Sequence, residues 1–278
     1  MLDCGLYVVA TPIGNLNDIS ARALDTLNAA EIIACEDTRV TKKLFALLGI
    51  SIHKRFICYQ NYNEEGKAAG IVDIIKNGQA VALVSDAGSP LISDPGYKLV
   101  SLCRKDGVKV YSIPGASAVI CALQLAGLPT NRFMFAGFIP NKDKARADLF
   151  NELKSINTTL VLYETAPRLL KTLQAAAEVF GIREMAVVRE ITKLYEDARN
   201  GTAQELAQYY TENPAKGEIV LVIAPPCQSE SAEIDVKAEL LCRMQKMSLK
   251  SAVEEVAALG GLSKKEVYNQ ALALKDNK

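Results

Sequence analysis

The chain has 278 residues, of which 49% are hydrophobic and 6% aromatic, and its 32 basic and 32 acidic residues give a formal net charge of zero. That length accommodates one large domain, or two smaller ones with an extension, and the aliphatic composition is typical of an α/β protein. The balanced charge argues against a protein that coats nucleic acid, because phosphate binding requires clustered Lys and Arg.

Apolar runs alternate with helix-like segments through the first 114 residues. The runs predict strands at 6–10, 32–35, 81–84 and 108–113. The segments between them predict helices at 21–30, in a stretch that stops at Gly49, at 64–76 and at 95–105. The segment 50–63 carries no decisive pattern.

A second series of elements follows residue 114. We expect helices at 117–126, at 142–154, from about Pro167 onward and at 203–210. We expect strands, in a second sheet, at 133–140, 159–163, 185–189 and 218–223. The sequence therefore predicts two α/β domains, at 1–114 and 115–226.

The remaining residues, 227–278, read as a linker and a helical tail. A polar stretch at 228–233 predicts the linker. Two apolar faces interrupted by Gly260 and Gly261 predict a short helix–turn–helix, and their residues are Leu249, Val253, Val256, Ala257, Val267, Ala271 and Leu274. A packing or dimer-forming appendage is at least as compatible with this pattern as a nucleic-acid reader.

The histidine and cysteine content limits the kinds of metal, catalytic and disulfide sites that the chain can form. His53 is the only histidine, which excludes metal sites with several His ligands, and no GxSxG motif accompanies it. The seven cysteines are scattered without a CxxC pair, which indicates a reducing compartment. The chain also has no basic leader and no apolar run of about 20 residues. We expect a soluble, cytoplasmic protein without a metal.

Three glycine-bearing turns each follow a predicted strand, at 10–16, 85–96 and 113–117. Loops at the carboxyl ends of parallel strands line a ligand crevice, so we expect these turns to meet at one pocket. Neither GxGxxG nor GxxxxGK[ST] is present, and Asp86 and Asp94 would repel phosphate. A cationic or polar-neutral ligand fits better, and S-adenosylmethionine is one candidate. Ordinary tight βα turns remain the alternative for each loop.

The motifs in these loops resemble one known family. They are Thr11-Pro12-Ile13-Gly14-Asn15-Leu16, Glu36-Asp37-Thr38-Arg39, the run 85–96, Pro114-Gly115, Gly127-Leu128-Pro129, Gly137-Phe138-Ile139-Pro140, Tyr163-Glu164, 189–193 and Gly217-Glu218. In order and spacing the chain is similar to bacterial small-subunit (16S) ribosomal RNA ribose 2′-O-methyltransferases of the tetrapyrrole-methylase fold. The resemblance covers essentially the whole chain.

That resemblance implies an enzyme that methylates a cytidine ribose in the decoding region, within the assembled small ribosomal subunit, usually as a homodimer. It implies S-adenosyl-L-methionine bound in a cleft between the two domains, in a pocket formed by Pro12, Asp86, Ser89, Ile92, Ser117, Ala118, Tyr163, Ala224 and Pro225. Two positions depart from the family pattern. Ala116 replaces a proline, and the segment 164–168 lacks the family's histidine, which cannot therefore serve the chemistry here.

Candidate catalytic and RNA-binding residues follow from charge near strand ends. Glu190 and Lys193 come just after a strand, and we interpret them as the pair that handles the proton of the ribose hydroxyl. Glu36, Asp37 and Glu164 are further candidates, and a surface ion pair is the alternative for each. The residues expected to contact RNA phosphates are Arg39, Arg168, Lys142, Lys144 and Arg146, with Lys264 and Lys265 of the tail as a second contact.

Two other functions compete with this interpretation. A methyltransferase of the same fold could act on a small tetrapyrrole precursor, but such enzymes typically open with Gly-x-Gly-Pro-Gly where this chain has residues 11–15. A non-enzymatic ribosome-associated binder could retain the cofactor fold, although the intact loops argue against it.

Overall fold

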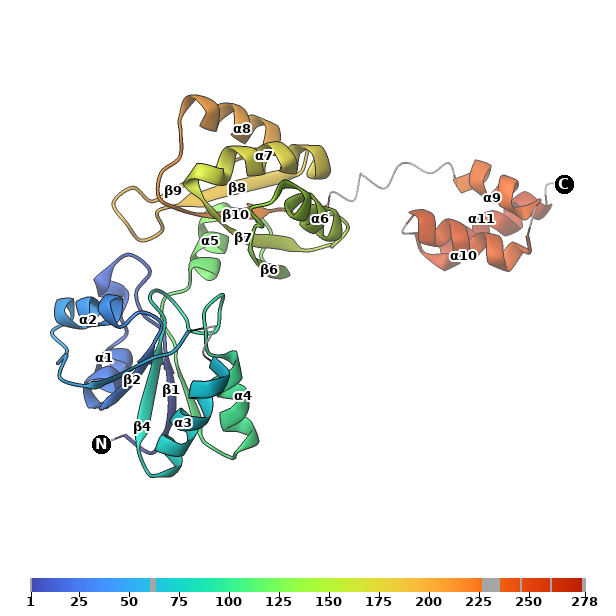
Figure 1. Ribbon diagram of the computed structural model, residues 1–278. Helices are drawn as coiled ribbons and strands as arrows, with labels where there is room; N and C mark the ends of the chain where they lie inside the picture. The colour runs from blue at the N-terminus through green and yellow to red at the C-terminus, as the bar shows by residue number, and fades with distance from the viewer. Residues whose placement is uncertain (1, 61–63, 227–235, 246, 261, 277–278) are drawn as a thin grey trace. The chain divides into compact units, whose positions relative to one another are not determined.

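The computed structural model describes residues 2–60, 64–226, 236–245, 247–260 and 262–276. It divides into two compact units, residues 1–225 and 226–278 (Figure 1). The first unit contains two five-stranded sheets with helices on their faces, which confirms the predicted α/β class. The predicted linker at 228–233 lies outside the described residues.

The first sheet is entirely parallel, in the order β3-β2-β4-β1-β5. Its strands are β1 (Gly5–Val9), β2 (Ile32–Cys35), β3 (Arg55–Cys58), β4 (Ala80–Val84) and β5 (Val110–Ile113). The side chains of β2 are buried throughout, because helices cover both faces of the sheet. Helices α1 (Ala21–Ala29) and α2 (Thr38–Leu47) pack on one face, and α3 (Glu64–Lys76) and α4 (Tyr97–Lys105) on the other.

The second sheet is mixed, in the order β6-β7-β10-β8-β9. Its strands are β6 (Phe133–Phe138), β7 (Thr159–Thr165), β8 (Glu184–Arg189), β9 (Asp197–Thr202) and β10 (Glu218–Ile223). Only the β6–β7 pairing is parallel, and the other three pairings are antiparallel. Because β10 runs opposite to β7, the end of β7 and the start of β10 lie at the same edge.

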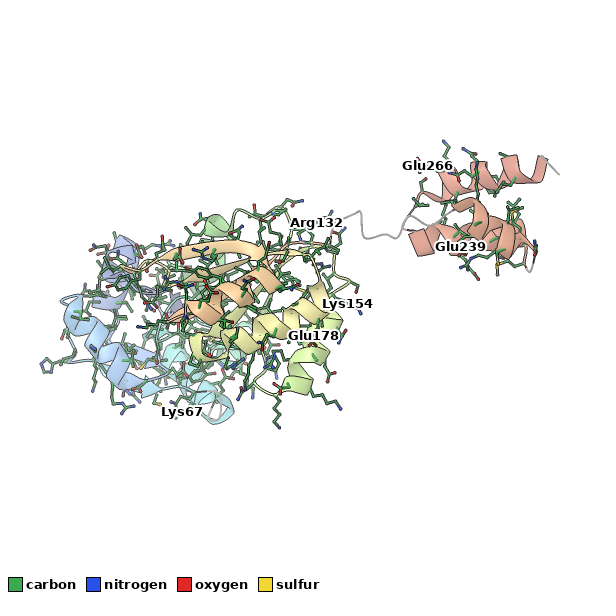
Figure 2. All side chains as sticks on the ribbon, turned by 90° about the horizontal axis from the view of Figure 1, so that it is seen from above. Lys67, Arg132, Lys154, Glu178, Glu239 and Glu266 are labelled. Carbon is green, nitrogen blue, oxygen red and sulfur yellow. The ribbon has the colours of Figure 1, made fainter. Side chains whose placement is uncertain are left out.

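Helices also cover both faces of the second sheet. Helix α5 (Ala118–Ala126) packs on one face through Val119, Ala122 and Leu123. The other face is covered by α6 (Asp143–Leu153), α7 (Ala166–Phe180) and α8 (Ala203–Glu212). Figure 2 labels Lys154, directly after α6, and Glu178 of α7, and both are exposed. The chain thus passes from one sheet to the other through residues 114–117.

The second unit is a small helical body with its own core. It consists of α9 (Val236–Met244), α10 (Leu249–Gly260) and α11 (Lys264–Asp276). The two predicted apolar faces meet there, since Val253, Val256 and Ala257 of α10 are buried with Val267 and Ala271 of α11. In the parts of the chain that the structure describes, no helix is long and apolar enough to cross a membrane.

Candidate ligand-binding site

The three glycine-bearing loops are tied to one another by hydrogen bonds. Thr11 N donates to Gly88 O at 2.8 Å, and Gly88 N returns a bond to Thr11 O at 3.1 Å. Ser89 Oγ donates to Ala116 O at 3.5 Å, which joins the second loop to the third. The close approach needs glycine, because a Cβ on Gly88 would lie 3.2 Å from the Ile13 side chain in a backbone with φ of +75°. The loops therefore form one connected wall.

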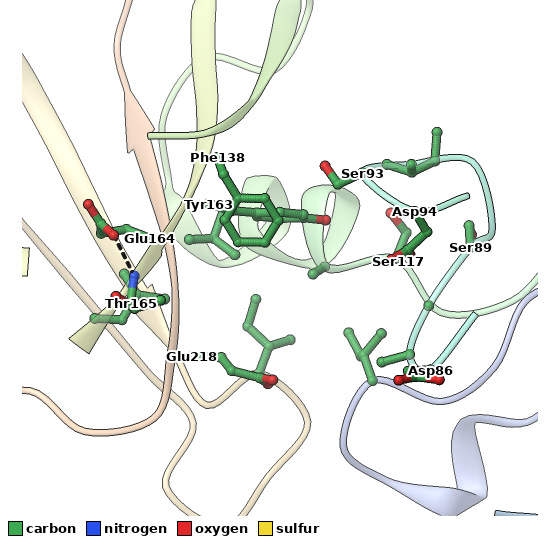
Figure 3. Close-up of a pocket in the computed structure, with 18 of the residues that line it drawn as sticks. Asp86, Ser89, Ser93, Asp94, Ser117, Phe138, Tyr163, Glu164, Thr165 and Glu218 are labelled. Carbon is green, nitrogen blue, oxygen red and sulfur yellow. Dashed lines mark hydrogen bonds between the residues drawn. The ribbon is translucent and has the colours of Figure 1, made fainter. Parts of the chain in front are cut away.

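This wall borders a cavity of about 390 Å³. Ile13, the run from Asp86 to Ser89 and Ile92 to Asp94 line it from the first half of the unit, and Ser117 and Ala118 line it from the start of α5. Residues at one edge of the second sheet line the opposite side, and they are Phe138, Tyr163, Glu164, Thr165, Ile191 and Gly217 to Val220. Figure 3 shows Asp86, Ser89 and Ser117 across the cavity from Tyr163 and Phe138. The volume lies within the range of about 300–1,000 Å³ that small-molecule sites occupy.

The first half contributes a negative field to the cavity. Burial first, and then the negative charges of Glu36 and Asp86, raise the pKa of Asp94 to about 6. The pKa of Asp86 is raised by burial and by Asp37, although a hydrogen bond from Asp37 N opposes this. Burial, then Asp86 and Asp37, raises the pKa of Glu36. Carboxylates that raise one another's pKa values favour a bound cation, which would relieve their repulsion.

The second half contributes an aromatic wall. The Tyr163 ring lies 4.7 Å from Phe135 and 5.1 Å from Phe138, centroid to centroid, in tilted and edge-on arrangements. Phe138 is 57% exposed although it is large and apolar. Burial, and then the charge of Asp94, raises the pKa of Tyr163 to about 12, so its hydroxyl stays protonated. A flat apolar group therefore has a surface to pack on.

A third cluster lies at the rim, where β8 ends and β10 begins. Lys193 Nζ donates to Glu190 Oε1 at 3.1 Å and to Glu218 Oε2 at 2.8 Å. Its hydrogen bonds to Glu218 and Glu190 raise the pKa of Lys193, and the bond from Lys193 lowers the pKa of Glu190. Lys193 is therefore an ammonium and Glu190 a carboxylate. Glu218 lines the cavity, whereas Glu190 and Lys193 are not among the described residues that line it.

Strained backbone concentrates in the two loops that border the cavity. Within the described part of the chain, the non-glycine residues with positive φ are Leu91, Ser93, Glu190 and Thr192, at 73°, 67°, 50° and 66°. Each such residue costs free energy, and such strain persists where a site requires the backbone to hold an unusual shape. Both loops are thus shaped for the cavity rather than relaxed turns.

The structure brings six of the nine residues predicted for the cofactor pocket to the cavity, and they are Asp86, Ser89, Ile92, Ser117, Ala118 and Tyr163. The described lining does not include Pro12, which is buried next to Ile13. It also does not include Ala224 and Pro225, because they follow the far end of β10, whose first residues line the cavity. Sequence reasoning missed Phe138, Ile191 and Val220. Strand pairing in the second sheet places Phe138 and Val220 there, and Ile191 lies in the loop after β8.

The predicted RNA contacts separate into exposed and internal groups. The Arg39 side chain is 90% exposed and pairs with Asp37 at 2.7 Å, and Lys142 and Lys144 are exposed. The Arg146 side chain is 6% exposed and holds Asp143, so its burial contradicts a role in phosphate contact. The Arg168 side chain is 26% exposed, and its guanidinium pairs with buried Glu164 at 3.0 Å, so its charge is already engaged within the protein.

Sequence comparison finds two family models in this chain. Residues 5–207 match the Tetrapyrrole (Corrin/Porphyrin) Methylases. Residues 230–275 match the RsmI C-terminal HTH domain. Together they span both units of the structure.

Curated relatives match over nearly the full length. The chain is 49% identical over 276 residues to ribosomal RNA small subunit methyltransferase I of Erythrobacter litoralis, covering 99% of this chain and 96% of the relative. It is 41% identical over 272 residues to the protein of the same name from Rickettsia prowazekii, covering 97% and 96%.

Solved structures share the fold at low identity. Diphthine synthase superposes with a TM-score of 0.61 at 17% identity, covering 79% of this chain and 89% of that one. The cobalamin biosynthetic enzyme cobalt precorrin-4 methyltransferase superposes with a TM-score of 0.57 at 16% identity, covering 79% and 94%. These two likenesses show the architecture alone.

Proposed function

Because the chain belongs to the ribosomal RNA small subunit methyltransferase I family, within the tetrapyrrole methylases, we propose that it methylates the ribose 2′-hydroxyl of a cytidine in the decoding region of 16S rRNA with S-adenosyl-L-methionine. The observation that carries this proposal is the identity of 40–49% to proteins of that name over nearly the whole chain. The alternative substrate, a tetrapyrrole precursor, is supported by the broader family model and by likeness of fold, but not by these full-length relatives.

The cavity residues fit this cofactor. S-adenosylmethionine carries a sulfonium and an ammonium group, and the raised pKa values of Asp86 and Asp94 mark a site whose carboxylates gain from a cation. The adenine is flat, and Tyr163 and Phe138 supply an aromatic surface. Ser89, Ile92, Ser117 and Ala118 would hold the cofactor on the loop side. When bound, it supplies a methyl group already activated by the sulfonium charge.

The protein's own contribution is position and proton handling. The loops fix one reactant, so the 2′-oxygen needs only to approach in line. We assign Lys193 as the ammonium that stabilises negative charge developing on the 2′-oxygen, and Glu190 as the carboxylate that orients Lys193 and takes up the released proton. The hydrogen bond from Lys193 lowers the pKa of Glu190 and so weakens it as a base. Stabilisation of the 2′-oxygen by Lys193 is therefore the larger contribution.

The substrate is proposed to reach the rim from solvent. Arg39, Lys142 and Lys144 remain candidates for phosphate contact because their side chains are exposed. The proposal includes the assembled small subunit as substrate, a homodimer as the working form and a cytoplasmic setting.

The deciding experiment supplies methyl-labelled S-adenosylmethionine to purified small subunits that lack the modification. We expect label on one cytidine ribose, mapped by mass spectrometry of nuclease fragments. Subunits that already carry the methyl group serve as the control and should accept none. Label on a porphyrinoid and none on RNA would refute the assignment.

A further inference from the structure

Phe138 stands on an irregular piece of edge strand. Among the described strands β6 pairs with β7 alone, and its register shifts between Phe135 and Phe138. Gly137, with φ of +75°, allows the backbone to turn at this bulge. The bulge re-aims the Phe138 ring into the cavity, where it is 57% exposed. Ladder hydrogen bonds alone therefore do not hold Phe138 in place.

Arg168 of α7 supplies a further restraint on this segment. One of its guanidinium nitrogens donates to the carbonyl oxygen of Ile139, the residue after Phe138. Ile139 N donates to Tyr163 O at 3.1 Å, so Ile139 is held at both its amide and its carbonyl. The guanidinium thus fixes the backbone on the far side of the bulge to the end of β7.

Glu164 anchors the guanidinium in turn. Its side chain is fully buried and lies 3.0 Å from Arg168 Nε, and it accepts hydrogen bonds from Thr172 Oγ1 at 2.5 Å and Thr165 N at 2.7 Å. A buried carboxylate needs such partners, since an unpaired one would be costly. The ion pair therefore cannot shift without breaking several bonds.

We propose that Arg168 is a positioning residue for the cofactor: anchored by Glu164, it holds the Ile139 carbonyl and so fixes the Phe138 ring against Tyr163 as one rigid wall of the pocket. This inference rests on the proposed function, because it takes the cavity as the cofactor site. It assigns Arg168 a role other than the RNA contact expected from its charge.

The main test uses two variants that damage the same network differently. Arg168→Met removes the bond to Ile139, whereas Thr172→Val removes one donor to Glu164 and leaves Ile139 held. Calorimetry should show S-adenosylmethionine binding weakened about 10-fold in Arg168→Met, the equivalent of about 1.4 kcal/mol of lost packing, with Thr172→Val within about twofold of wild type. The kcat at saturating cofactor should stay within about twofold in both. Arg168→Lys keeps the positive charge but lacks the forked donors of the guanidinium, and its affinity for S-adenosylmethionine should lie between those of Arg168→Met and wild type.

An optical test does not depend on cofactor binding. The chain contains no tryptophan, so Phe138→Trp provides a single reporter. Adding Arg168→Met should shift its emission to the red and increase acrylamide quenching, whereas adding Thr172→Val should change neither. Equal effects of the two variants on affinity and on emission would overturn the proposal, since both would then act through general destabilisation. A wild-type protein that binds no cofactor would refute the proposed function, and the emission comparison would still decide the role of Arg168.

Discussion

Asp94 connects the stability of the protein to its ligand. Its pKa of about 6 lies above the ordinary value of 3.8, chiefly through burial. Protonated Asp94 therefore contributes stability that is complete below about pH 4 and lost as the pH rises through about 6. At pH 7 the carboxylate is ionised, and its partly buried charge lowers the free energy of unfolding of the ligand-free protein. A cationic ligand offsets that loss.

Replacing Asp94 with Asn tests this connection. Asp94→Asn should raise the free energy of unfolding at pH 7 by about 1 kcal/mol, a value reduced from the full pKa shift because water screens a partly exposed group. The gain should vanish near pH 4 in urea titrations. The same variant should weaken S-adenosylmethionine binding at pH 7, as measured by calorimetry. A variant that is less stable than wild type at pH 7 would contradict this account.

Lys193 is the residue on which the proposed chemistry depends most. Lys193→Met removes the ammonium from the rim, and we expect turnover on small subunits to fall about 100-fold or more, the usual scale for a proton-handling group. Cofactor affinity should stay within about twofold, because Lys193 does not line the described cavity. Lys154→Met, which removes an exposed ammonium that does not line the described cavity, is the matched control and should keep the wild-type turnover. Unchanged single-turnover rates would remove Lys193 from the mechanism.

At the scale of elements, the turn before β10 fixes the rim. Gly217 has φ of +83°, and a Cβ there would lie 2.0 Å from Glu190 Oε1. Gly217→Ala must therefore displace Glu190 and its hold on Lys193, and we expect methyl transfer to fall about 10-fold or more through misplacement of the pair. Gly107→Ala imposes a similar backbone strain at φ of +71° with nothing within 4 Å. Both variants should lose similar stability in thermal unfolding, and only Gly217→Ala should lose this much activity.

The sequence predicted elements wherever local chemistry decides the structure. Gly and Pro mark the three loops, and buried aliphatic runs mark the parallel strands. The sequence did not predict β9 (Asp197–Thr202), because it is a polar edge strand without apolar alternation. It did not predict β3 either, because β3 lies in the segment without a clear pattern. The mixed direction of the second sheet depends on long-range pairing, so the aromatic half of the cavity could not be read from spacing. The burial of Arg146 and the pairing of Arg168 with Glu164 depend likewise on tertiary packing.

At the scale of the whole molecule, the chain divides after Pro225 into two compact units. Every described residue that lines the cavity belongs to the first unit. A protein ending at Pro225 should therefore bind S-adenosylmethionine within about twofold of the full chain, measured by calorimetry. Its thermal unfolding should shift upward with cofactor as in the full chain, because ligand stabilises whichever unit binds it. Loss of cofactor binding on truncation would show that the helical unit completes the site.

The passage at 114–117 is the covalent link between two separately layered halves of the first unit, which also meet where Ile13 packs against the core of the second sheet. Gly115 fits closely there, because a Cβ would lie 3.0 Å from the Ala10 side chain. A small molecule in the cavity contacts residues of both halves and so adds a noncovalent connection between them. The thermal unfolding temperature and the resistance to proteolysis should therefore increase with the fraction of the protein that has bound the methyl donor.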